Sequence, residues 1–101
     1  MERREIKVIY RERAIKSIRN FGIYIEEKGF PETAEKFVKV LMSFGNSLNV
    51  LPEKYSICRN PSFAKRKYRC AVFKKKYIFI YKVVKNELII FNVVYGSRFN
   101  Y

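Results

Sequence analysis

Residues 68–98 read YRCAVFKKKYIFIYKVVKNELIIFNVVYGSR, and this segment sets the architecture of the chain. It contains three runs rich in Val, Ile, Tyr and Phe, which are typical of strands. The predicted strands lie at residues 68–73, 77–84 and 88–95. Lys74-Lys75-Lys76 and Lys85-Asn86 connect them. Because connections this short join antiparallel neighbours, the sequence predicts a three-stranded meander.

Two helices and a strand are predicted ahead of this meander. Residues 12–28 repeat apolar side chains at helical spacing, and so do residues 31–48. Gly29 is suited to end the first helix and Pro31 to begin the second, so the two helices should form an antiparallel hairpin. Their apolar stripes are expected to be core. Alternation over residues 6–10 predicts a short strand before the helices.

The predicted order of elements is β-α-α-β-β-β, with a connecting segment at residues 49–67 where periodicity fades. This order indicates an α+β fold with an antiparallel-rich sheet and the helical hairpin packed on one of its faces. A chain of 101 residues has the length of one compact domain. We therefore expect residues 1–101 to form a single domain.

The chain is strongly basic, and its charge is unevenly placed. It carries 22 Lys and Arg against 9 acids, a formal net charge of +13. Residues 1–35 hold eight cations and seven Glu, a net of +1, and residues 36–101 hold fourteen cations and two Glu, a net of +12. Such an excess favours a polyanionic or acidic partner over a merely solvated surface. The candidate nucleic-acid-binding residues are Lys65, Arg66, Lys67, Lys74, Lys75 and Lys76.

Composition excludes several kinds of chemistry. The chain has no His and no Asp, which removes the Ser-His-Asp and Cys-His forms of nucleophilic catalysis and the usual zinc sites. Two-metal phosphoryl chemistry needs clustered carboxylates and is not expected either. We predict no metal, no cofactor and no small-molecule substrate.

The two cysteines, Cys58 and Cys70, are interpreted as free thiols. The N-terminus is charged and leads into no apolar segment of the kind that a signal peptide has, and no apolar run is long enough to span a membrane. We therefore expect a cytoplasmic protein without a membrane partner. In a reducing compartment a cysteine pair is more often two thiols than a disulfide. Cys70 alternates with Tyr68 and Val72 and is predicted to be a core residue, whereas Cys58 has no predicted place.

The C-terminal third resembles the RelE/ParE superfamily, the toxins of bacterial type II toxin–antitoxin modules. The resemblance rests on a Tyr68-Arg69 strand, a Tyr77-x-x-x-Tyr81 strand and a last strand that closes on Gly96 and Arg98. Leu51-Pro52-Glu53 also looks like the family's link between helical hairpin and sheet. The resemblance implies a cognate antitoxin as partner and a toxin of either the RelE or the ParE branch.

The RelE branch cleaves mRNA on the ribosome with basic side chains and a C-terminal tyrosine. By that pattern, the candidate catalytic residues are Arg69, Arg98 and Tyr101. Cations near the scissile phosphate would stabilise the developing charge. The chain departs from the pattern at Ala71 and Ile78, where basic residues are expected.

The ParE branch lacks this nuclease set and inhibits DNA gyrase instead, and its helical hairpin is similarly long. The target is therefore either the ribosome with its mRNA or DNA gyrase, and the sequence does not distinguish the two. A different class of function, a non-enzymatic nucleic-acid-binding module, is favoured by the charge alone. An acidic or DNA-binding reading frame beside this one would favour the toxin.

Overall fold

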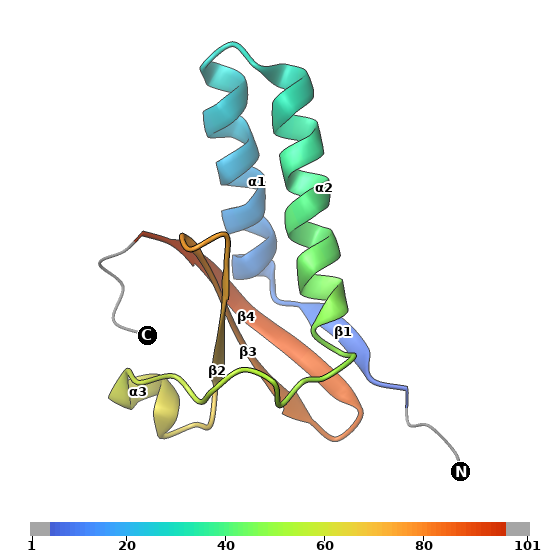
Figure 1. Ribbon diagram of the computed structural model, residues 1–101, viewed down its shortest axis with the longest axis vertical. Coiled ribbons are helices and arrows are strands. Elements are labelled where there is room, and N and C mark those ends of the chain that lie inside the picture. The colour runs from blue at the N-terminus through green and yellow to red at the C-terminus, as the bar shows by residue number, and fades with distance from the viewer. Residues whose placement is uncertain (1–4, 97–101) are drawn as a thin grey trace.

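The computed structural model describes residues 5–96 and has the predicted order of elements (Figure 1). The elements are β1 (Lys7–Tyr10), α1 (Glu12–Glu27), α2 (Pro31–Ser47), α3 (Pro61–Ala64), β2 (Arg69–Phe73), β3 (Tyr77–Val84) and β4 (Glu87–Tyr95). The α+β prediction is confirmed. The connecting segment adds the single-turn helix α3, which begins at Pro61 after Asn60, whose side chain accepts a hydrogen bond from the backbone N–H of Ser62.

The sheet has the strand order β1-β4-β3-β2. Strands β2, β3 and β4 form the predicted antiparallel meander, and β1 lies parallel to β4 with Ile9 opposite Ile89. The register between β3 and β4 shifts at Ile80/Tyr81, where β4 holds one extra residue. Because a bulge changes which side chains face each way, the inward residues of β4 change from even to odd numbers along the strand.

The helical hairpin closes as its turn residues require. Gly29 has a φ of +93°, and its N–H donates to the Glu26 carbonyl, which ends α1. Pro31 opens the first turn of α2. Halfway along the hairpin, a Cβ at Gly22 would lie only 2.7 Å from Val38 Cγ2, so the glycine allows the two helices to approach closely.

Both faces of the sheet are covered, by different parts of the chain. The main core lies between the hairpin and the sheet and contains Leu41, Phe79 and Tyr81, all 0% exposed. A second group, the α3-side cluster, lies on the opposite face; its buried members are Cys58, Cys70, Ile78 and Ile80. The hairpin reaches well past the sheet, so its tip stands clear of the rest of the molecule (Figure 1). Within residues 5–96, no helix is long and apolar enough to cross a membrane.

Candidate functional surfaces

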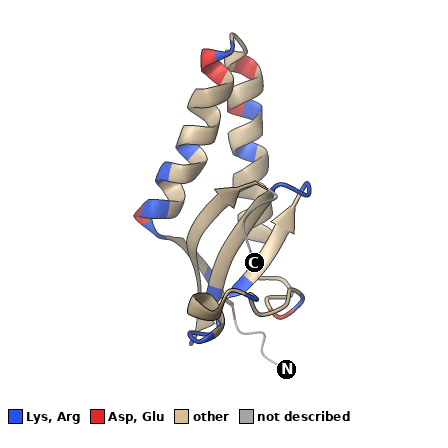
Figure 2. Cartoon of the chain, turned by 90° about the vertical axis from the view of Figure 1, so that its left-hand side faces the viewer, with Lys and Arg blue, Asp and Glu red and all other residues tan. Residues whose placement is uncertain are grey.

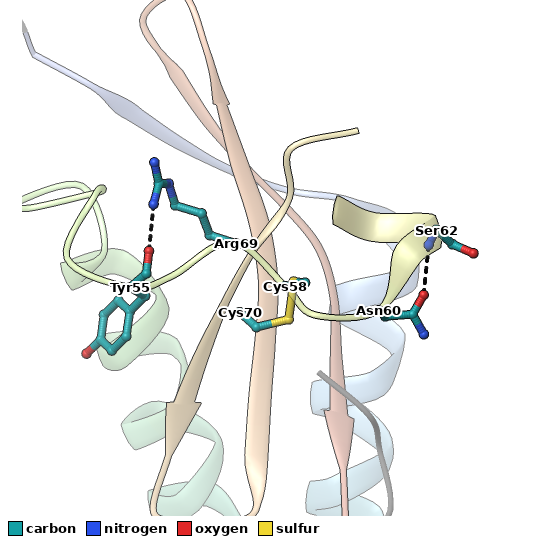
Figure 3. The surroundings of a disulfide bond; sticks show 6 residues. All are labelled: Tyr55, Cys58, Asn60, Ser62, Arg69 and Cys70. Atoms are coloured by element: carbon teal, nitrogen blue, oxygen red, sulfur yellow. Dashed lines mark hydrogen bonds between the residues drawn. A yellow bond between two sulfur atoms is a disulfide. The ribbon is translucent and has the colours of Figure 1, made fainter. Parts of the chain in front are cut away.

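Arg69 begins β2 and is held by the connecting segment. Its Nη1 donates to the Tyr55 carbonyl over 2.7 Å (Figure 3). Across the ladder it lies opposite Tyr81, whose hydroxyl donates to the Pro52 carbonyl over 2.5 Å. Burial raises the pKa of Tyr81 to about 12, against the smaller opposing effect of the Arg69 charge. Both side chains therefore fasten residues 52–55 to the sheet, and the guanidinium of Arg69 is engaged in a structural bond.

The two positions where the RelE pattern expects further cations are apolar and inaccessible. Ala71 is 0% exposed and belongs to the main core, and Ile78 is 1% exposed and belongs to the α3-side cluster. Because they lie on opposite faces of the sheet, neither could join a site with the other. Arg98 and Tyr101 lie outside the described residues, so their catalytic role stays a prediction.

The candidate nucleic-acid-binding residues form two groups. The first group, Lys65–Lys67, follows α3 at the start of β2, where Lys82 Nζ donates to the Arg66 carbonyl over 3.4 Å and lies 5.0 Å from the Tyr68 ring. The second group, Lys74–Lys76, forms the β2–β3 turn at the other end of the strand. Five residues of β2 separate the groups by roughly 13 Å or more. All six side chains are exposed, but they make two basic patches at opposite ends of one hairpin (Figure 2).

Several of these lysines occupy backbone conformations that lysine seldom adopts. In the described part of the chain, every residue other than glycine with a positive φ is a lysine: Lys67, Lys74, Lys75 and Lys85. Glycine and asparagine adopt this conformation more readily than lysine does. Lysine at these positions costs conformational free energy that glycine or asparagine would not. This cost favours a function for the positive charges over the interpretation that they are only solvated turn residues.

The outer side of the helical hairpin carries an apolar groove of about 680 Å³. Ile15 and Ile23 line it from α1 and are 41% and 45% exposed, while Val38 and Met42 line it from α2. The predicted apolar stripes do form core, with Ala14, Ile18 and Leu41 buried between hairpin and sheet, but the groove beside them was not predicted. A second stripe on α1, Ile15 and Ile23, was the available signal, because its spacing places it off the line of Ala14 and Ile18.

Cys58 and Cys70 form a disulfide with their Cα atoms 5.1 Å apart (Figure 3), so the prediction of two free thiols is wrong. The prediction that Cys70 is a core residue is confirmed. Ile57 pairs with Arg69 in an antiparallel bridge, so the segment before α3 runs back along the edge of β2. The Cys58 N–H donates to the Tyr68 carbonyl over 2.9 Å beside this bridge. Residues 49–67 show no periodicity, so the pairing of this segment with β2 was not visible in the sequence.

The fold and the sequence are similar to known toxins. The solved structure described as the chromosomal ParDE TA system from P. aeruginosa superposes with a TM-score of 0.77 at 12% identity, covering 94% of this chain and 100% of that one. No curated protein sequence matches the chain. The family model of the ParE toxin of the type II toxin–antitoxin system parDE matches residues 8–98. The chain therefore belongs to the ParE toxin family of type II toxin–antitoxin systems.

Proposed function

We propose that this ParE-family toxin stops growth by inhibiting DNA gyrase in the cytoplasm and does not cleave mRNA. The observation that carries the proposal is the loss of the RelE cations from the sheet. Ala71 and Ile78 are buried in apolar surroundings on opposite faces, and the Arg69 guanidinium is bonded to the Tyr55 carbonyl. A phosphate cleaved on this sheet would lack the charges needed to stabilise its transition state.

The two basic patches are proposed to contact the target. Gyrase works on DNA, so the complex of enzyme and DNA presents an anionic surface. The exposed lysines of the β2–β3 turn and of residues 65–67 would attract such a surface, with a strength that falls as salt rises. This contact needs charge and position but no catalytic group.

The groove of the helical hairpin is proposed to hold the antitoxin, because the family implies an antitoxin partner. Apolar side chains form its floor, and its rim carries both signs of charge, with Arg19 and Lys39 against Glu26 and Glu35. This composition suits an amphipathic helix that buries an apolar face and sets charged residues against the rim. The toxin would then have separate surfaces for antitoxin and target.

Two parallel reactions test the mechanism. Purified protein is added to a gyrase supercoiling reaction and to a translating extract in which mRNA ends are mapped. We expect loss of supercoiling and no new mRNA ends. New ends within codons would instead establish the RelE mechanism. If neither reaction responds, the non-enzymatic nucleic-acid-binding module becomes the better interpretation. Expression of the chain alone should also halt bacterial growth, and co-expression of the neighbouring antitoxin gene should restore it.

A further inference from the structure

We propose that Cys58 and Cys70 are a reversible redox switch that fixes or releases the basic segment 59–67. The bond joins two cysteines 12 residues apart and so ties both ends of this segment to the edge of β2. A ParE-family toxin that acts on gyrase works in a reducing compartment. Disulfides there are mostly transient or redox-sensing, whereas permanent structural ones are rare. Two parts of this inference rest on the proposed function: the assignment to a reducing compartment and the measurement of gyrase inhibition.

Besides the disulfide, the segment is held to the sheet by the α3-side cluster and by hydrogen bonds at its two ends, from the Cys58 N–H to the Tyr68 carbonyl and from the Cys70 N–H to the Ser56 carbonyl. Phe63 packs edge-on against Tyr68 and Phe91, with ring centroids 5.8 and 5.9 Å away. A backbone bridge between Ile57 and Arg69 precedes the segment. None of residues 58–68 belongs to the main core between hairpin and sheet. Breaking the disulfide should therefore loosen this segment and leave the rest of the fold in place.

The segment carries cationic side chains whose positions would become less fixed if the segment loosened. Residues 59–67 contain four cations, and no acid occurs anywhere between Glu53 and Glu87. In the oxidised form the Arg66 carbonyl accepts a hydrogen bond from Lys82, which brings the basic group of the segment next to a cation of β3. Fixed cations bind an anionic partner with less loss of conformational entropy than mobile ones do. The oxidised toxin should thus be the more potent form.

The chemistry is ordinary thiol–disulfide exchange. The thiolate of one cysteine attacks an external disulfide, such as oxidised glutathione, and releases one glutathione thiol. The second cysteine then attacks the mixed disulfide and releases the other. Two protein thiols are oxidised to one disulfide while one external disulfide is reduced to two thiols. Cys58 and Cys70 are 2% and 8% exposed, so exchange proceeds through local opening of the segment.

Hydrogen exchange measured on the oxidised and reduced protein tests the switch. We expect amides of residues 58–68 to exchange about 30–1,000-fold faster after reduction, since closure of a loop this long stabilises by that order. Amides of α1 and β4 should not change. The double variant Cys58→Ser/Cys70→Ser should match the reduced protein and show no response to reductant, which controls for other effects of the reagent.

Three results of these measurements would overturn the switch: unchanged exchange on reduction, unfolding of the whole domain on reduction, or a disulfide that persists in millimolar reduced glutathione. Gyrase inhibition by both forms completes the test, and we expect the reduced form to be several-fold weaker. Equal potency would overturn the regulatory role and leave the gyrase proposal standing. If neither form inhibits gyrase, the proposed function fails, and the exchange measurement still decides whether the switch exists.

Discussion

The helical hairpin and the β2–β4 meander bury their apolar side chains in different ways. The hairpin packs one side on the sheet and leaves Ile15 and Ile23 uncovered on the other. The meander is covered on both faces, with Phe79 in the main core and Ile80 in the α3-side cluster. The hairpin thus leaves part of its apolar surface exposed to solvent, as expected of a surface that binds an apolar partner. The meander has both of its apolar faces covered by other parts of the chain.

The two regions also differ in charge. Acids gather at the tip of the hairpin (Figure 2). The acids nearest the turn between α1 and α2 are Glu26, Glu27, Glu32 and Glu35. The described turns of the meander carry Lys74–Lys76 and Lys85, with Glu87 the one acid nearby in the sequence. A partner chosen by shape and apolar contact and another chosen by charge can therefore meet separate parts of this chain. The following experiments test this division, from the largest expected effect to the smallest.

The hairpin groove should be the more sensitive surface toward the antitoxin. We expect Ile15→Glu with Ile23→Glu to weaken antitoxin binding about 100-fold or more, because binding would then have to remove two carboxylates from water in an apolar groove. Both side chains are partly exposed, so the fold should persist. The measurement is a calorimetric titration with the cognate antitoxin. Tyr24→Glu, on the same helix outside the groove, is the matched control, and equal losses in both variants would place the antitoxin elsewhere.

Substitution of Arg69 distinguishes a structural role of this residue from a catalytic one. Its charged hydrogen bond to the Tyr55 carbonyl predicts that Arg69→Ala lowers the free energy of unfolding by about 1.5–3 kcal/mol. Gyrase inhibition measured well below the melting temperature should hardly change. Unfolding in urea and the supercoiling reaction give the two quantities. A variant with the stability of the parent and a toxicity lower by about 10²–10³ would restore the catalytic interpretation.

One buried tyrosine, Tyr81, and one half-buried tyrosine, Tyr10, predict a loss of stability at high pH. Burial raises the pKa of Tyr10 and of Tyr81 from the ordinary tyrosine value of 10.0 to about 12. The folded state therefore holds these protons more tightly, so their contribution is complete below pH 10 and is lost as pH rises through 12. Tyr10 anchors the hairpin, with its hydroxyl 3.0 Å from the Met42 carbonyl. Urea unfolding at pH 8 to 12 should show a shallower decline for Tyr10→Phe and for Tyr81→Phe than for the parent; an equal decline would contradict the shifts.

Replacing a lysine that has a positive φ by glycine should raise the stability of the fold slightly and weaken target binding. Lys75 has a φ of 65°, and relief of this conformation by Lys75→Gly outweighs the greater backbone entropy that glycine loses on folding. The variant should therefore be more stable by about 0.5–1 kcal/mol and should bind the anionic target more weakly. Lys76→Gly removes the same charge at a residue without positive φ and should not stabilise. Thermal unfolding and a salt series of target binding measure both effects. A gain in stability with unchanged binding would mean that the turn has no role in recognition.

Local patterns in the sequence predicted most of the elements. The β-rich run of β3, the alternation in β1 and the helical spacing in α1 and α2 each depend on neighbours a few residues away. Gly29 and Pro31 end and begin helices by their own backbone geometry. The family pattern likewise located Arg69 in β2. What the sequence missed was the engagement of that side chain by the Tyr55 carbonyl, 14 residues earlier in the chain.

By itself, the sequence determined the order of elements, the meander, the charge excess and the family, because each depends on residue identity and short spacings. Tertiary structure decided the rest. It paired Cys58 with Cys70, divided the lysines between two ends of β2 and left one side of the hairpin open. These features depend on which distant segments meet, and a contact between aperiodic segments leaves no repeating pattern in the chain. Local propensity therefore determined which segments form helices and strands, whereas the packing of the whole fold determined which side chains share an exposed surface.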